Sequence, residues 1–281
     1  MQNLYSEKYT TNDVELDVNE KLSVTEILKL MQRTTFSHSQ LIGLDHQTMI
    51  DRDNAFWVIT KMKVVCNNSI GANQKLTLKT WTRKPQAVRF LRDLQIKQKN
   101  KILVKGVSEW CCLDYKTRTL RRSNSIKYPD LQMVETKEKN LTFTNLKVDV
   151  TKKDFVYTKT IMPTDIDVNL HTNNLKYNVI ALDALSLNDL QNSSPRQLLL
   201  QLYQAATGNP SLLVFLALIF SHILLPYHNH LLLDDDIHVQ SCHRFFLCLH
   251  VPLTALSRNL SFLQMYCMVI HVPYPAYFRC V

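Results

Sequence analysis

The sequence predicts an α+β fold made of two copies of one unit, each a long helix wrapped by an antiparallel sheet. Three observations lead to this prediction. A capping box introduces a helical run near the N-terminus, β-like segments follow that run, and an acidic segment before the helix recurs about 152 residues further along the chain. A sheet that follows its helix in this way would bury the apolar stripe of the helix.

The first unit begins with a strand over about residues 5–15, and the capping box Ser23-Val24-Thr25-Glu26 then marks a helix start. In such a box the Ser hydroxyl and the Glu carboxylate each accept a hydrogen bond from a free backbone N–H. Apolar or small side chains recur at mostly helical spacing as far as Leu41, and Gly43 is typical of a helix C-terminus. We expect a helix of about eighteen residues.

A series of strands should follow this helix. Four segments are rich in Val, Ile, Thr, Phe and Trp, and they cover about residues 56–65, 76–83, 88–96 and 102–113. The connections between them carry turn residues and are short enough for hairpins. The sequence therefore predicts successive antiparallel strands that wrap the helix.

The second unit restarts the same order after a polar stretch. Residues 131–150 are charged and lack a clear period, which predicts a linker between an N-terminal domain at 1–130 and a second domain that starts within 151–190. A strand over about residues 155–161 and an Asp/Asn/His segment at 165–177 precede an apolar helical run. The order strand, acidic turn and helix is thus repeated.

Residues 191–281 differ from the rest of the chain. They contain no Lys and no Glu, yet they hold seven of the ten His, and their Leu-rich runs are broken by six Pro. A reading-frame shift or a translated intron would give such a composition, so we expect this part to be disordered or mis-translated and the second sheet to be truncated. Its longest apolar run, residues 212–225, falls short of the roughly 20 residues that a membrane span needs.

Charge and cysteine usage indicate partners and compartment. The net charge is +9, nearly all of it before residue 191, which favours an acidic protein, nucleic acid or nucleotide-tailed substrate, although solvated strand faces and hairpin tips would give the same composition. The N-terminus shows neither an apolar signal region nor an Arg/Ser-rich transit pattern, so we expect a cytoplasmic protein. The odd count of seven Cys and the adjacent Cys111 and Cys112 favour reduced thiols.

The candidate site is the segment that runs from Asp165 to Tyr177. In extended geometry Asp167, Asn169 and His171 share one face, so that an acid, an amide and an imidazole can converge. The alternative is a polar turn that caps the next helix, with Asn173 or Asn174 as the N-cap residue and His171 merely exposed. A related segment at residues 13–19 lacks the histidine and is better interpreted as structural.

This segment, followed by Leu182-Asp183-Ala184-Leu185, resembles the active-site segment of the acyl-acyl carrier protein thioesterases. Further matches lie upstream in the order of that family and extend the resemblance over about residues 3–190; they are Tyr9 to Glu15, Leu30-Met31-Gln32, Phe56-Trp57-Val58, Thr80-Trp81, Arg89 to Asp93, Trp110 to Asp114 and Thr117-Arg118. The resemblance implies a tandem (double) hot-dog fold. It also implies hydrolysis of the thioester that joins a fatty acyl chain to its carrier protein, which releases a free fatty acid in fatty acid biosynthesis.

In the family an Asp-x-Asn-x-His element acts in catalysis, and the matching positions here are Asp167, Asn169 and His171. We assign His171 as general acid and base, Asn169 as the group that orients the thioester, and Asp167 as an orienting group or water activator. The free N–H groups and the positive end of the following helix would favour a developing oxyanion. The family usually adds a downstream Glu, often followed by Cys, but this chain has no Glu after Leu187.

The resemblance implies an acidic acyl carrier protein as partner and requires no cofactor. We expect no metal, because Cys242, His243, Cys248 and His250 lack a second pair at zinc-finger spacing. We expect no nucleic acid, because the chain has no Gly-rich phosphate loop and its three Trp lie on separate predicted strands. The sequence does not decide whether the chain forms a homodimer. The rival functions are a noncatalytic acyl-binding or scaffold protein and a thioesterase that acts on acyl-coenzyme A.

Overall fold

The computed structural model describes residues 3–134, 141–143, 154–168, 173–204, 211–222, 244–252 and 263–271. Its helical elements are η1 (Asp13–Glu15), α1 (Val24–Leu41), α2 (His46–Asp53), η2 (Ser123–Ser125), η3 (Pro163–Asp165), α3 (Asn174–Asp183) and α4 (Leu187–Gln191). Its strands are β1 (Tyr5–Thr10), β2 (Ala55–Cys66), β3 (Lys75–Thr82), β4 (Phe90–Gln98), β5 (Lys101–Asp114), β6 (Leu120–Arg121), β7 (Asp154–Ile161), β8 (Ser193–Gln204), β9 (Ser211–His222), β10 (Arg244–Pro252) and β11 (Leu263–His271).

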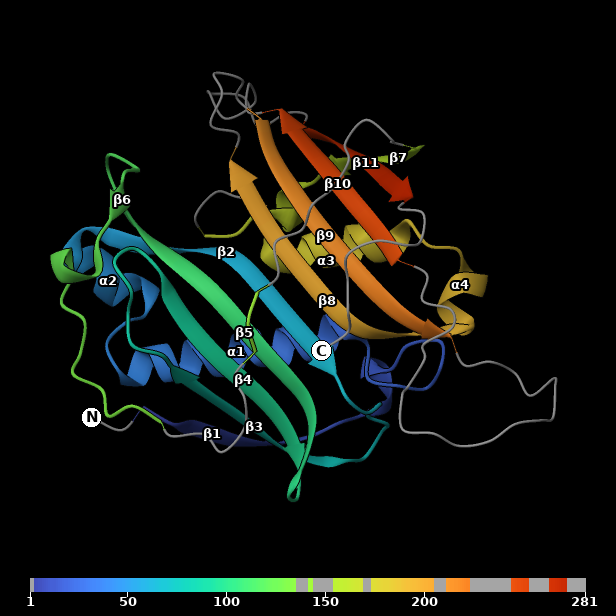
Figure 1. Ribbon diagram of the computed structural model, residues 1–281, viewed down its shortest axis with the longest axis horizontal. Coiled ribbons are helices and arrows are strands. Elements are labelled where there is room, and N and C mark those ends of the chain that lie inside the picture. The colour runs from blue at the N-terminus through green and yellow to red at the C-terminus, as the bar shows by residue number, and fades with distance from the viewer. Residues whose placement is uncertain are drawn as a thin grey trace.

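The strands form one continuous antiparallel sheet. Its order is β1-β3-β4-β5-β2-β8-β9-β10-β11-β7, and β6 pairs with β5 outside this path. The two halves join where β2 pairs with β8, from Lys61 opposite Gln201 to Val65 opposite Gln197. Helix α1 lies behind the first half and α3 behind the second half (Figure 1), so each unit wraps its sheet around one helix.

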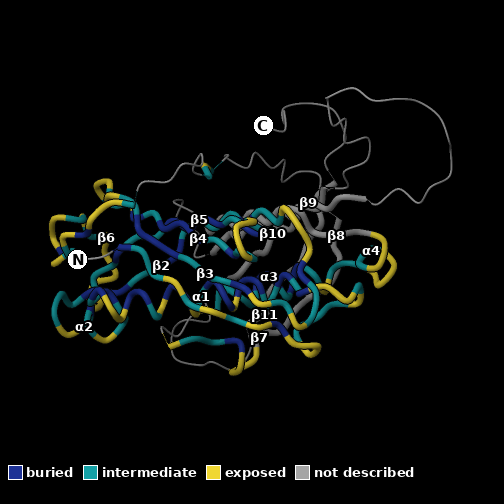
Figure 2. The backbone as a smooth tube through the Cα atoms, turned by 90° about the horizontal axis from the view of Figure 1, so that it is seen from below, coloured by how far each residue is buried: buried dark blue, intermediate teal, exposed yellow. Residues whose placement is uncertain are grey.

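Helix α1 forms the core of the first unit. Its buried residues Ile27, Leu28, Leu30 and Met31 pack in one cluster with apolar side chains of β3, β4 and β5, such as Leu94. Figure 2 shows many exposed residues at turns and connections, and α1 buries one of its faces. Burial of apolar side chains is the main favourable contribution to folding, so this helix is the centre of the stable part of the chain.

The predicted elements of the first unit are present with small shifts. Helix α1 has 18 residues, and the Ser23 hydroxyl accepts from the Glu26 N–H at 3.2 Å. The Glu26 carboxylate differs from the prediction, because it pairs with the Lys29 ammonium at 2.6 Å. The first strand ends at Thr10, earlier than predicted, since the chain turns into η1. Helix α2 was not predicted from the sequence.

The internal repeat has a period of 150 residues in the structure, not 152. The helices η1 and η3 are displaced by 150 residues, and so are the N-cap residues Ser23 of α1 and Asn173 of α3. Asp17 therefore corresponds to Asp167, and Asn19 to position 169. A shift of two residues keeps the alternation of side chains between two faces, so the sequence pattern fits both registers and could not distinguish them.

Strands β8 to β11 lie where the sequence pattern indicated no sheet. The uninterrupted apolar run of β9 gives no alternation, and such a run is consistent with a strand but does not identify one. Two prolines of this part lie among the described residues, and both fall at tolerated places: Pro195 adjoins a register shift of the β8–β9 pair, and Pro252 ends β10. The predicted domain boundaries and the expected mis-translation of residues 191–281 stay predictions.

The two halves of the sheet differ in strand order. In the first half β1 pairs with β3 and β2 pairs with β5, so the first two strands lie at opposite edges of the set. In the second half β8 to β11 follow one another as a meander, and β11 pairs with β7. Among the described residues no helix is long and apolar enough to cross a membrane.

Candidate active site

The structure describes only one of the three predicted site residues. Asp167 is half-buried and lies between η3 and α3. Asn169 and His171 lie outside the described residues, so the convergence of the three side chains stays a prediction. Asn173 is the N-cap residue of α3, and its side chain accepts from the Leu175 N–H at 3.0 Å, as the capping alternative predicted for Asn173 or Asn174.

Asp165 fixes both ends of the predicted active-site segment. Its backbone carbonyl accepts from the Asn173 N–H at 2.8 Å, which closes the loop onto the start of α3. Its side chain, in a residue that is only 4% exposed, accepts from the Met162 N–H at 3.0 Å and pairs with the Lys176 ammonium at 3.0 Å. The sequence assigned no role to Asp165 or Lys176. These two side chains come together only because the chain turns between η3 and α3.

The related turn of the first unit is held by its own hydrogen bonds. The Asp17 carboxylate accepts from the backbone N–H groups of Asn19 at 2.9 Å and of Lys21 at 3.2 Å. The Asn19 side-chain amide donates to the Leu190 carbonyl at 2.7 Å, which ties this turn to α4. The Glu15 carboxylate accepts from the Asn12 N–H at 3.0 Å. These contacts are those of a structural turn.

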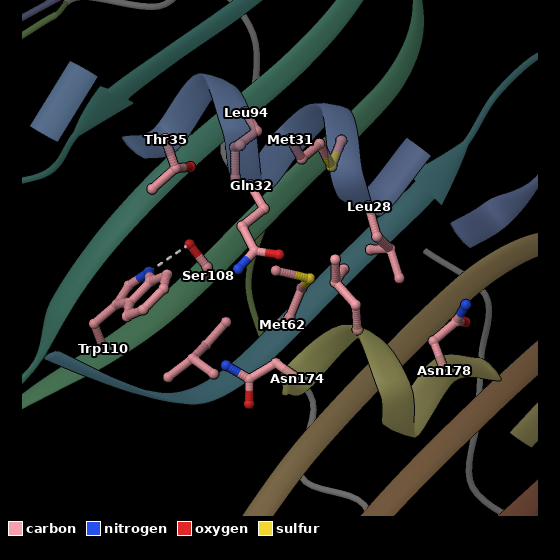
Figure 3. A pocket seen from close by; sticks show the side chains of 12 residues that line it. Leu28, Met31, Gln32, Thr35, Met62, Leu94, Ser108, Trp110, Asn174 and Asn178 are labelled. Atoms are coloured by element: carbon pink, nitrogen blue, oxygen red, sulfur yellow. Dashed lines mark hydrogen bonds between the residues drawn. The ribbon is translucent and has the colours of Figure 1, made fainter. Parts of the chain in front are cut away.

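A cavity of about 30 Å³ lies between α1, α3 and the strands β2, β4 and β5 (Figure 3). Its apolar lining consists of Leu28, Met31, Ile59, Met62, Leu94 and Leu175. Its polar lining consists of Gln32, Thr35, Ser108, Asn174 and Asn178, together with the indole of Trp110, which donates to the Ser108 hydroxyl at 2.8 Å. The cavity thus combines an apolar wall with several hydrogen-bonding groups.

The cavity reaches the first turn of α3. Asn174 is the first residue of this helix and lines the cavity, three residues after His171 in the chain. Asn173 accepts from the N–H groups of Leu175 and Lys176, whereas the Asn174 N–H has no acceptor among the described residues. A free helix N-terminal amide beside a cavity is a favourable place for an oxyanion.

An outer groove of about 630 Å³ runs along the exposed face of α1. Lys29, Arg33 and Phe36 line it, and so do Gln32 and Leu175, which also line the inner cavity. These two shared side chains are therefore the partition between the open groove and the cavity. A substrate that entered from the groove would pass between α1 and the start of α3.

A buried guanidinium braces the sheet against the last turn of α1. Arg92 is 5% exposed, and it contacts the His38 Nδ1 at 2.7 Å, the Ser39 hydroxyl at 3.3 Å and the Thr80 hydroxyl at 3.3 Å. Burial, together with the nearby Arg92 charge, lowers the pKa of His38 to about 4. Arg92 lies opposite Ser108 in the β4–β5 pair, so this network holds the cavity wall in place.

Cysteines and metal-binding side chains supply no further site in the described part of the chain. Cys66, Cys111 and Cys112 are free thiols, and burial is the main cause that raises the pKa of each. No group of three or more His, Cys, Asp or Glu side chains is placed to hold a metal ion among the described residues. Cys242 and His243 lie outside them.

Residues 2–125 match the family model of the acyl-ACP thioesterase N-terminal domain. The chain is 23% identical over 200 residues to the acyl-[acyl-carrier-protein] hydrolase FATB1 of Cuphea viscosissima, an alignment that covers 65% of this chain and 46% of the relative. It is 22% identical over 228 residues to the palmitoyl-acyl carrier protein thioesterase of Gossypium hirsutum, which covers 75% and 54%. The chain thus spans about half the length of these curated relatives.

Two solved structures share the fold over nearly the whole chain. An acyl-ACP thioesterase of Bacteroides thetaiotaomicron superposes with a TM-score of 0.63 at 17% identity, covering 95% of this chain and 97% of that one. The 12:0-ACP thioesterase of Umbellularia californica gives a TM-score of 0.59 at 16% identity, covering 95% and 94%. The predicted tandem hot-dog fold is confirmed, and so is the resemblance on which it rested.

Proposed function

We propose that this chain, whose residues 2–125 match the N-terminal domain of the acyl-ACP thioesterases, hydrolyses the thioester of a fatty acyl-acyl carrier protein and releases a free fatty acid. One observation supports this proposal above the others. The inner cavity lies against α1 and reaches the first turn of α3, directly after the Asp/Asn/His segment. An acyl chain in the cavity would therefore place its thioester beside the predicted catalytic residues.

The acyl chain requires the cavity to open. A volume of about 30 Å³ is far less than a fatty acyl chain needs. Met31 and Met62 line the cavity, and methionine is unbranched and adapts its shape readily. We propose that these two side chains move aside when the acyl chain enters, so that α1 and the first sheet enclose the chain.

In the proposed reaction His171 removes a proton from a water molecule as the water oxygen attacks the thioester carbon. The carbonyl oxygen becomes an oxyanion, which the free Asn174 N–H and the positive end of α3 stabilise. The carbon–sulfur bond then breaks, and His171 returns the proton to the leaving sulfur. The products are a fatty acid and the carrier thiol. Asn169 orients the thioester, and Asp167 orients the histidine or the water.

The outer groove is the proposed entry for the arm of the carrier protein, which is the part that bears the acyl thioester. Lys29 and Arg33 are about half exposed in the groove, where Lys29 pairs with Glu26 and Arg33 lies 3.5 Å from the Glu7 carboxylate. Both could exchange these partners for the acidic groups of a carrier protein. The net charge of +9 is consistent with an acidic partner. Cytoplasmic location and a homodimer stay predictions.

A noncatalytic acyl-binding protein is the second candidate. The observation that favours it is the sequence after Leu187, which contains no Glu to complete a site of the family type. Such a protein would bind the acyl chain in the same cavity and release no fatty acid. The two candidates therefore differ in turnover and not in binding.

The experiment measures free fatty acid released from acyl-acyl carrier protein by the purified full-length chain, with acyl-coenzyme A as a parallel substrate. We expect release from the carrier-protein substrate and a loss of release in His171→Ala. Binding without release would favour the noncatalytic protein. Faster release from acyl-coenzyme A would favour a thioesterase that acts on acyl-coenzyme A.

A further inference from the structure

Asn178 is a buried polar residue at a position where the first unit has an apolar one. The 150-residue repeat relates Asn178 of α3 to Leu28 of α1, and both side chains line the inner cavity (Figure 3). Asn178 is 2% exposed. An amide at such a place needs hydrogen-bond partners, because burial removes those that water would supply.

Only one end of this amide is satisfied. The Asn178 Nδ2 group donates to the Thr25 hydroxyl of α1 at 3.0 Å. The Asn178 Oδ1 atom is buried and has no hydrogen-bond partner among the described residues. The bond to Thr25 holds the amide of this cavity-lining residue in place, so its carbonyl oxygen is a fixed acceptor to which no described residue donates.

The surface of the cavity is mainly apolar, with a smaller polar part. Gln32, Thr35, Ser108 and Asn174 line it with amide or hydroxyl groups, in addition to Asn178. A pocket for an unsubstituted alkyl chain gains from apolar side chains alone, whereas hydrogen-bonding groups in a pocket fix the orientation of a ligand that carries matching polar groups.

We propose that the Asn178 Oδ1 atom accepts a hydrogen bond from a hydroxyl group on the acyl chain, so that the site prefers hydroxyacyl over saturated acyl thioesters. This inference rests on the proposed thioester hydrolase. A site built to bind a substrate hydroxyl discriminates strongly against the analogue that lacks it, because the buried acceptor is then left without a partner.

The position of Asn178 specifies where the hydroxyl sits. Asn178 lies one turn beyond Asn174, about 6 Å along the axis of α3 at 1.5 Å per residue. The thioester is placed at the helix start, so a donor near Asn178 belongs to the first few carbons of the acyl chain. A hydroxyl on the third carbon fits this spacing, and a hydroxyl at the far end of a long chain does not.

The amide N–H of the carrier arm is a less suitable donor. The proposed path of the arm is the outer groove, which Gln32 and Leu175 line but Asn178 does not. Asn178 lines only the inner cavity, on the acyl side of this partition.

The test measures hydrolysis of three thioesters on the same carrier protein: decanoyl, 3-hydroxydecanoyl and 10-hydroxydecanoyl. We expect the full-length chain to prefer the 3-hydroxy substrate by roughly tenfold or more in kcat/KM, as an unpaired buried acceptor would dictate. Asn178→Leu, which installs the residue type of Leu28, should abolish this preference. Asn188→Leu, an exposed control on α4, should keep it.

Equal rates for decanoyl and 3-hydroxydecanoyl substrates would overturn the inference, and so would a preference that survives in Asn178→Leu. A preference for a 3-oxodecanoyl substrate would overturn it as well, because a carbonyl offers no donor to Oδ1. If Asn178→Leu lowers the melting temperature markedly, Thr25→Val serves as the second variant. It removes the bond that holds the amide, and loss of the preference in that variant would support the inference.

Failure of the proposed function is detected separately. Calorimetric binding of free 3-hydroxydecanoic and decanoic acids needs no turnover. A chain that hydrolyses nothing but binds the hydroxy acid more tightly, with the difference lost in Asn178→Leu, would contradict the hydrolase and support the role of Asn178. Hydrolysis of all three thioesters without preference would support the hydrolase and contradict the role of Asn178.

Discussion

In the first unit the polar side chains of the turn before the helix are hydrogen-bonded to backbone groups, whereas in the second unit polar side chains line a cavity. The Asp17 carboxylate accepts from two backbone N–H groups, and Asn19 donates to α4. In the second unit Asp165 closes the loop, and α3 carries Asn174 and Asn178 on the cavity wall. The corresponding face of α1 carries Leu28. The comparison indicates that one equivalent helix position serves packing in the first unit, as Leu28, and carries a buried polar group in the second unit, as Asn178.

The largest expected effect is on the stability of the first unit, where α1 packs against the sheet. Met31 is 2% exposed, and its thioether lies against Gly106. Met31→Ala should lower the free energy of unfolding by about 2–5 kcal/mol, because it removes buried groups and leaves a cavity. The same space should admit longer acyl chains. Thermal unfolding and a chain-length series of substrates measure both effects, and the exposed Met133→Ala is the control.

Acid should weaken the first unit through His38. Its pKa of about 4 in the folded chain lies below the ordinary value of 6.5, so the unfolded chain takes up the proton first as the pH falls. Stability is therefore lost between about pH 6.5 and pH 4, by up to about 3 kcal/mol, and is constant with respect to this group outside that window. Urea unfolding across this range should show a shallower pH dependence in His38→Gln, while His46→Gln should behave as the unsubstituted chain.

Asp165 tests whether the loop of the second unit depends on a side chain. Asp165→Asn weakens the pair with Lys176 and the bond from the Met162 N–H, and we expect a loss of about 1–3 kcal/mol because the residue is buried. Thioester hydrolysis should fall too, since Asp165 contacts both ends of the segment that holds the predicted catalytic residues. The exposed Asp183→Asn is the matched control. An unchanged rate of thioester hydrolysis in Asp165→Asn would contradict this role of Asp165.

The helix caps should give the smallest effect and the sharpest comparison. Ser23→Ala and Asn173→Ala each remove an N-cap bond at equivalent positions, and each should cost about 1 kcal/mol. Only Asn173→Ala should also reduce turnover, because Asn173 adjoins the predicted active-site segment. Equal losses of activity in both variants would show that the two helix starts are not specialised.

The local elements of the first unit could be predicted because their signals are local. The hydroxyl of Ser23, the stop at Gly43 and the alternating strands depend on neighbours in the chain. The period of the repeat could not be fixed, since a two-residue shift leaves the alternation intact. The pair of Asn178 with Thr25 spans 153 residues, and no local pattern indicates it. The strands of residues 193–271 carry apolar runs without alternation, which is why the sequence did not predict them.

The site was predicted from chemistry and resemblance, and its supporting residues were not. Asp167 was chosen because its type and spacing match a known element. Asp165, Lys176 and Asn178 act through contacts that form only when the turn and two helices come together. Such residues carry ordinary polar side chains on a helix or turn, so the sequence offers no signal that separates them from solvent-exposed ones.

The most direct test compares the equivalent positions of the two turns. With the 150-residue repeat, His171 corresponds to Lys21. We predict that His171→Ala lowers kcat/KM for acyl-acyl carrier protein by roughly 100-fold to 10,000-fold, the contribution of a general acid and base, while Lys21→Ala changes it by less than about twofold. Equal rates for the two variants would contradict the claim that only the second turn is catalytic.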